Sequence, residues 1–203
     1  MKMHALDRAL LLGMSLLAAF QVSIGIEGLS TLPIISYTIG FGVLLVAGLL
    51  LIILGFEALE APIVVIISTV IPLSLSVGLV WQNLPGVRSV YLILAAIGFL
   101  AVLLTRSLGA PPRLAVLTVA LVHGIAGMII FLLPILLRAR GAAGSAYLLV
   151  SAGGALIGAG GLLLSFLRMG VPILPRKTLL RGMPILLLLT TALFVAGFRF
   201  GSA

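Results

Sequence analysis

His123 is the histidine whose surroundings could support metal or proton chemistry. It lies about ten residues into an uncharged run, 114–137, and Gly124 and Gly127 follow it closely. Such small neighbours would let a second helix or a flat ligand approach. An imidazole there can be the axial ligand of a haem or a pigment, or a proton relay, and it can equally be a neutral ring bonded to a neighbouring helix. His4 is too near the N-terminus to complete a bis-histidine haem, so a five-coordinate haem or pigment stays open and the cofactor is unknown.

Two carboxylates stand three residues apart, at Glu57 and Glu60, just before Pro62. If a helix continues through them, this spacing places both on one face. Such a pair could bind a cation at the mouth of a pore, or dock a partner. The two acids also fit the solvated first turn of a helix that begins near Pro62, where the helix dipole favours negative charge. In either case we expect Glu57 and Glu60 at the membrane interface.

Hydroxyl side chains occur inside two of the apolar runs. Pro72 removes one backbone hydrogen bond of its helix and frees the carbonyl of Ser68, so a kink is expected near the middle of that helix. The hydroxyls could line a cavity there, or satisfy the freed backbone and join helices together. The residues of this candidate transport or packing path are Ser68, Thr69, Pro72, Ser76, Thr190 and Thr191.

Small residues repeat at helical spacing between positions 151 and 159. In a membrane, small residues at a four-residue step let two helix backbones approach closely, because lipid supplies no hydrophobic drive for helix association. The repeat predicts a helix-packing face, whose partner is either another part of this chain or another subunit. Its residues are Ser151, Gly154, Ala155, Gly158 and Ala159.

The composition requires a membrane around these residues. Apolar residues make up 63% of the 203 residues and charged residues 8%, against about 45–50% and about 25% in soluble domains. The net charge of +8 is spread thinly between apolar runs, which favours lipid headgroups over nucleic acid as the partner. The absence of cysteine excludes disulfides, thiolate nucleophiles and cysteine-ligated metals within this sequence.

Seven uncharged runs of 17 to 29 residues are each long enough for one crossing of a bilayer core about 30 Å thick. They lack the alternation of a β-barrel. The sequence therefore predicts an all-α polytopic bundle of about seven transmembrane helices with short loops, as a single domain over 1–203. Tyr37, Trp81, Tyr91 and Tyr147 fall near the expected helix ends, where amphipathic rings prefer to lie. The expected spans are 6–26, 33–56, 61–82, 89–106, 114–137, 144–168 and 179–198.

The lysines and arginines predict an orientation. With the N-terminus in the cytoplasm, eight of the twelve basic residues fall on the cytoplasmic side and four on the other. This bias favours a cytoplasmic N-terminus and an outside C-terminus, in the plasma membrane of a prokaryote. The first helix is longer than the apolar core of a signal peptide, so we expect it to stay uncleaved.

None of the charged residues is expected near the middle of the membrane. Proton- or sodium-driven transporters usually keep a carboxylate or an unwound polar segment there, and the sequence shows no catalytic or metal-binding motif. We therefore expect a non-catalytic integral subunit or accessory protein, whose partners are the bilayer and other membrane subunits. The alternative is a compact transporter, channel or lipid-handling protein for neutral or amphipathic cargo, with a path lined by the third, fifth and seventh helices.

Overall fold

The structure, a computed structural model, describes residues 3–168 and 170–201, except for the side chains at positions 57, 60, 62, 165 and 168. Within that part of the chain, seven α-helices are joined by short connections, and two of these connections contain a 3₁₀ turn. The elements in order are α1 (Ala5–Ile24), α2 (Thr31–Leu54), η1 (Phe56–Glu60), α3 (Pro62–Asn83), α4 (Arg88–Ser107), α5 (Pro112–Ala139), η2 (Ser145–Tyr147), α6 (Leu148–Arg168) and α7 (Arg176–Gly201).

All seven helices are long and apolar enough to cross a membrane, which confirms the expected seven-helix bundle. Most observed ends lie within two or three residues of the expected ones, and the differences have local causes. The first helix stops at Ile24 because Gly25 takes a φ of +63°, a conformation that favours glycine. The sixth helix starts only at Leu148, after the 3₁₀ turn η2.

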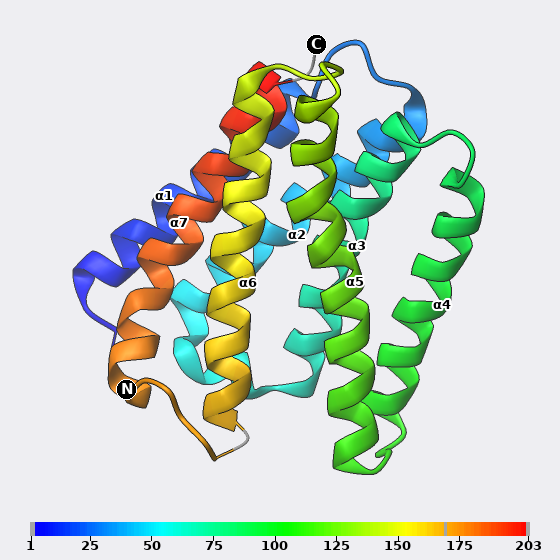
Figure 1. Cartoon of the computed structure of the whole chain (residues 1–203). Helices are drawn as coiled ribbons and strands as arrows, with labels where there is room; N and C mark the ends of the chain where they lie inside the picture. The colour runs from blue at the N-terminus through cyan, green and yellow to red at the C-terminus, as the bar shows by residue number, and fades with distance from the viewer. Residues whose placement is uncertain (1–2, 169, 202–203) are drawn as a thin grey trace.

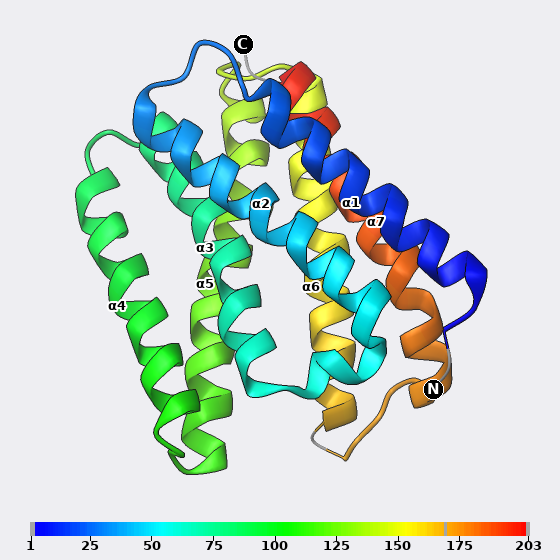
Figure 2. The same ribbon diagram turned by 180° about the vertical axis from the view of Figure 1, so that it is seen from behind.

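Six of the helices form a closed ring in the order α1, α2, α3, α5, α6 and α7, with α7 packing back against α1. The helix α4 stands outside the ring and packs mainly against α3 and α5 (Figures 1 and 2). The burial of its side chains agrees with this position, because half of its apolar side chains are exposed, including Val90, Ile93 and Ile97 at 60%, 60% and 56%. Within a bilayer such a surface faces lipid or another membrane protein.

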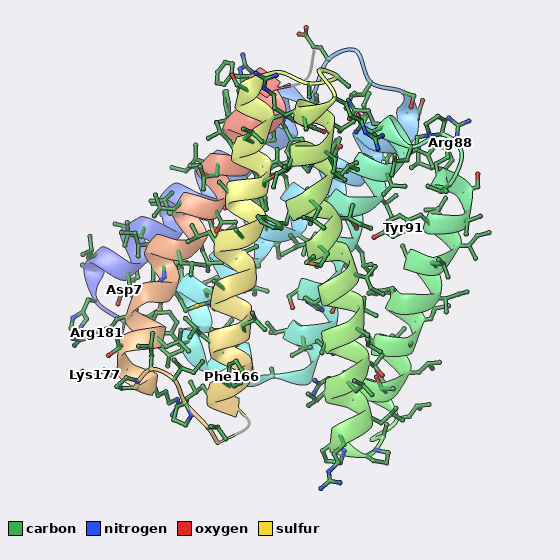
Figure 3. The ribbon with its side chains drawn as sticks, viewed as in Figure 1. Asp7, Arg88, Tyr91, Phe166, Lys177 and Arg181 are labelled. Atoms are coloured by element: carbon green, nitrogen blue, oxygen red, sulfur yellow. The ribbon has the colours of Figure 1, made fainter. Side chains whose placement is uncertain are left out.

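The chain termini, the connections and the charged residues lie at the two ends of the bundle. The N-terminus, η1 and the α4–α5 and α6–α7 connections lie at the lower end in Figure 1, and the C-terminus lies at the upper end. Charged residues of the described helices fall in the outermost two turns, as with Asp7 in α1, Arg181 in α7 and Arg199 near the end of α7. Figure 3 shows Lys177 and Arg181 toward the lower end, Asp7 above them near the start of α1, and Arg88 at the upper end.

Glycines permit the closest helix contacts in the ring. A Cβ added at Gly48 of α2 would collide with the Met14 and Ser15 side chains of α1. One added at Gly78 of α3 would lie 2.6 Å from the Tyr37 ring of α2. Because lipid competes equally well for apolar side chains, this close backbone approach is the main source of attraction between membrane helices.

Candidate functional site

The hydroxyls of α3 are bonded to their own helix. Ser68 and Thr69 donate to the Val65 carbonyl oxygen at 3.0 and 2.7 Å, and Ser76 donates to the Leu73 carbonyl oxygen at 3.0 Å. Thr69 and Ser76 are fully buried, whereas Ser68 and Pro72 are half-buried. These contacts fit the packing interpretation of the candidate path, in which hydroxyls satisfy backbone carbonyls inside the membrane.

The two threonines of α7 differ from one another. Thr191 is fully buried and donates to the Leu187 carbonyl oxygen at 2.8 Å. Thr190 is 3% exposed, and its Oγ1 has no hydrogen-bond partner in the described part of the chain. On α6, Ser151 is 4% exposed, and its Oγ likewise has no described partner. Two buried hydroxyls of adjacent helices therefore remain available to water or to a ligand.

His123 lies half-buried on α5, and its Nδ1 is 3.1 Å from the Val119 carbonyl oxygen. A carbonyl oxygen only accepts hydrogen bonds, so Nδ1 must carry the proton in this contact. In the neutral ring Nε2 then keeps a lone pair, which is the form of histidine that can ligate a metal. The geometry thus fits either an axial ligand or a histidine that is bonded only to its own helix.

The carboxylate pair lies in η1, between α2 and α3 at the lower end of the bundle. The side chains of Glu57 and Glu60 are outside the described part of the structure. Pro62 is the first residue of α3, so the acids precede that helix in a 3₁₀ turn and do not continue α2.

The small residues of α6 separate into two faces. Gly153 and Gly160 contact α7, where an added Cβ would lie 2.8 Å from the Phe194 ring and 2.8 Å from Leu186. Gly154 faces α5, where an added Cβ would lie 3.0 Å from Ile130 Cγ2. The remaining small residues of the repeat are exposed; they are Ala155, Gly158 and Ala159.

An aromatic and amide cluster at the upper end was not anticipated as a site. The Phe198 ring of α7 has its centroid 4.6 Å from that of Tyr37, 6.1 Å from that of Phe41 and 6.3 Å from that of Tyr147. Tyr37 donates its hydroxyl to Gln82 Oε1 at 3.3 Å. Tyr37 and Tyr147 are each 2% exposed, so they lie inside the bundle and do not face headgroups. In the sequence, the position of these two tyrosines near helix ends was the one feature that pointed to this cluster.

A small pocket lies beside this cluster, between the end of α1 and the start of α2. Its volume of about 10 Å³ has room for about one water molecule. Gln21 is 2% exposed; its Nε2 donates to the Gly25 carbonyl oxygen at 2.8 Å, and its Oε1 has no partner among the described residues. The pocket does not reach the candidate path or His123. Its lining residues are Gln21, Gly25, Ile26, Ile34, Tyr37, Thr38 and Phe41.

The fold and the end-located charges define a multi-pass integral membrane protein with seven spans. No family model, curated protein or solved structure matches the chain.

Proposed function

We propose that the protein is a non-catalytic integral subunit or accessory protein of a larger membrane assembly. The observation that carries this proposal is the exposed face of α6, on which Ala152, Ala155 and Ala159 recur at steps of three and four residues. These positions are neighbours on a helix surface. Together they form a flat face of the kind that packs against another transmembrane helix.

Another face of the same helix shows what such small residues do inside the bundle. Gly153 and Gly160 bring α6 into close contact with α7, so small residues on this helix already serve helix packing. Lipid has no comparable preference for a flat helix face, because flexible acyl chains pack equally well against large and small side chains. The exposed alanines therefore favour a helix of a partner subunit.

Two further observations favour this role over that of a driven transporter. The α3 hydroxyls that could have lined a path are bonded to their own helix. The charged residues of the described helices stay in the outer turns, away from the depth at which driven transporters keep ionisable groups.

The charge distribution supports an orientation for this subunit. By chain position, the lower end holds eight lysines and arginines and the upper end four. We infer that the lower end, with the N-terminus, is cytoplasmic and that the C-terminus lies outside. We further propose that the protein lies in the plasma membrane of a prokaryote.

Co-purification tests the proposal. The tagged chain is extracted from its native membrane in mild detergent, and every co-purifying protein is identified. Stoichiometric membrane partners are expected, and they should be lost from a variant carrying Ala155→Leu and Ala159→Leu. Ala96→Leu, at an exposed position of α4, is the matched control and should keep them. A stable isolated monomer in mild detergent would contradict the proposal.

An absorption spectrum of the same preparation tests the cofactor at His123. A haem or pigment ligated by Nε2 would give a Soret or pigment band, and His123→Leu would remove it. A preparation without such a band leaves His123 as a residue bonded to its own helix.

The alternative, a compact transporter or channel for small neutral cargo, is favoured by the unpartnered hydroxyls of Ser151 and Thr190 in the bundle interior. Hydroxyls in that state can bind water or a polar solute. Swelling of proteoliposomes in water and glycerol gradients tests it. A conducting protein should swell vesicles faster than empty liposomes do and should change its rate with Thr190→Val, whereas equal rates would remove the alternative.

A further inference from the structure

Gln21 carries a buried polar group in the last turn of α1. The side chain is 2% exposed. Its Nε2 donates to the Gly25 carbonyl oxygen at 2.8 Å, whereas its Oε1 has no hydrogen-bond partner in the described part of the chain. An unpaired buried amide oxygen costs free energy, and acyl chains have no group that could pair with it. The amide oxygen therefore calls for a partner from outside the chain.

The hydrogen bond to Gly25 fixes which way the Gln21 amide points. A carbonyl oxygen accepts hydrogen bonds and cannot donate them, so the NH₂ group of the amide must face Gly25. Turning the amide by 180° would bring two oxygen atoms together at that contact. The unpaired atom of Gln21 is therefore an acceptor, and whatever binds it must donate a hydrogen bond.

The pocket between the end of α1 and the start of α2 fits such a donor in size. Its volume of about 10 Å³ is about the space that one water molecule needs. Gln21, Gly25 and Thr38 are among its lining residues, and they carry an amide, a backbone carbonyl and a hydroxyl. Buried waters make about two to four hydrogen bonds, which these three groups can supply. Figure 2 shows the two helix ends at the upper end of the bundle.

The charges around the pocket favour a neutral occupant over a cation. Among the described residues that line it, none is charged. The Arg199 guanidinium lies 5.8 Å from the centroid of the Phe20 ring, in the same part of α1 as Gln21. Glu27 of the following connection is exposed, so solvent screens its charge. A cation would lose its hydration here without a buried counter-charge, which is costly.

We propose that this pocket binds one ordered water molecule, which donates to Gln21 Oε1 and joins α1 to α2 through the Thr38 hydroxyl. Gln21 and Thr38 lie on opposite sides of the α1–α2 connection, residues 25–30, so the water ties together the two helices that this connection links. Ile34 and Thr38 are exposed, and the pocket therefore opens to the outside of the bundle near its upper end. This site is independent of the exposed alanine face of α6.

NMR of the full chain in lipid nanodiscs tests the contact between water and Gln21. The chain holds two glutamines, Gln21 and Gln82, so ¹⁵N-glutamine labelling gives two side-chain amide signals, which Gln21→Leu assigns. We expect the Gln21 amide protons to show a nuclear Overhauser effect to water with the sign of a long-lived complex. Its absence would overturn the proposal. Its loss on addition of ammonium chloride would also overturn it and would assign the pocket to a cation.

A double-mutant cycle tests whether the water joins the two helices. Gln21→Leu and Thr38→Val each remove one partner of the water, so their effects on unfolding should be non-additive. We expect a coupling of roughly twofold or more in the equilibrium constant of unfolding, as for residues that share a hydrogen-bond network. Additive effects would overturn the proposal.

Two matched variants show whether the coupling depends on the Thr38 hydroxyl. Thr38→Ser keeps the hydroxyl and should combine additively with Gln21→Leu. Ser23→Ala should also combine additively, because the Ser23 hydroxyl is exposed and donates to the Ala19 carbonyl oxygen at 2.8 Å. Equal coupling of Gln21→Leu with Thr38→Ser and with Thr38→Val would overturn the proposal, since it would assign the coupling to the carbon atoms of Thr38.

Discussion

The Tyr91 hydroxyl of α4 donates a hydrogen bond to Ser76 Oγ of α3 at 2.8 Å (Figure 3). This bond joins the helix outside the ring to the ring itself. Ser76 is fully buried and its hydroxyl donates a hydrogen bond to the Leu73 carbonyl oxygen, so the three groups form a short hydrogen-bonded chain. At the upper end Arg88 of α4 lies over the Trp81 ring of α3, 5.0 Å from its centroid. Polar contacts thus add to the limited apolar packing of α4.

Tyr91→Phe should loosen α4 without unfolding the ring. Hydrogen bonds between membrane helices contribute about 0.6 kcal/mol on average and at most about 1.7 kcal/mol, so the loss in the free energy of unfolding should fall in that range. Hydrogen exchange of the α4 amides should accelerate relative to α6. Equal exchange in the variant and the parent would show that the bond does not hold α4.

Gly78→Ala should destabilise the contact of α2 with α3. The new methyl group would lie 2.6 Å from the Tyr37 ring, and overpacking of this kind costs about 1–3 kcal/mol. The free energy of unfolding in mixed detergent micelles measures the effect. Gly42→Ala, with open space beside it, is the control and should be neutral or stabilising, because alanine is the better helix former. A neutral Gly78→Ala would mean that the two helices do not approach this closely.

Phe198→Ala should weaken the upper end of the bundle. Phe198 is 2% exposed and contacts aromatic rings of α2, α7 and η2. We expect a loss of about 1–3 kcal/mol, below the ~3–5 kcal/mol of soluble cores, because the unfolded helices remain in lipid and lose packing only. Phe200→Ala, at a position that is 69% exposed, should cost little. Similar losses for both variants would contradict the burial described.

The spans could be read from the sequence because charge is excluded from the hydrocarbon core. Even the short uncharged run 89–105 marks a helix, Arg88–Ser107, since basic side chains at its ends can reach the interface. The 3₁₀ turn η1 was not expected, because Glu57 and Glu60 are equally compatible with the end of one helix or the start of the next.

The sequence did not predict in the same way which helices pack against one another. The step from Gly154 to Gly158 predicts one continuous packing face, yet only Gly154 meets α5, because the two helices diverge below that point. Tyr37 and Tyr147 are placed near helix ends by the sequence, and their burial depends on α2, α6 and α7 converging there. Helix register and crossing angle depend on contacts between distant residues, which periodicity in a single helix does not encode.

Cysteine accessibility tests the seven-span arrangement most directly, since the chain has no native cysteine. Single substitutions are made at the exposed positions Ser30 and Ala142 of the upper connections, Ser107 at the lower end of α4, Val171 of the α6–α7 connection, and Ile97 within α4. With a charged maleimide, Ser30→Cys and Ala142→Cys should react in intact cells, Ser107→Cys and Val171→Cys only after permeabilisation, and Ile97→Cys under neither condition. Two successive connections labelled from the same side, or a reactive cysteine at position 97, would contradict the account.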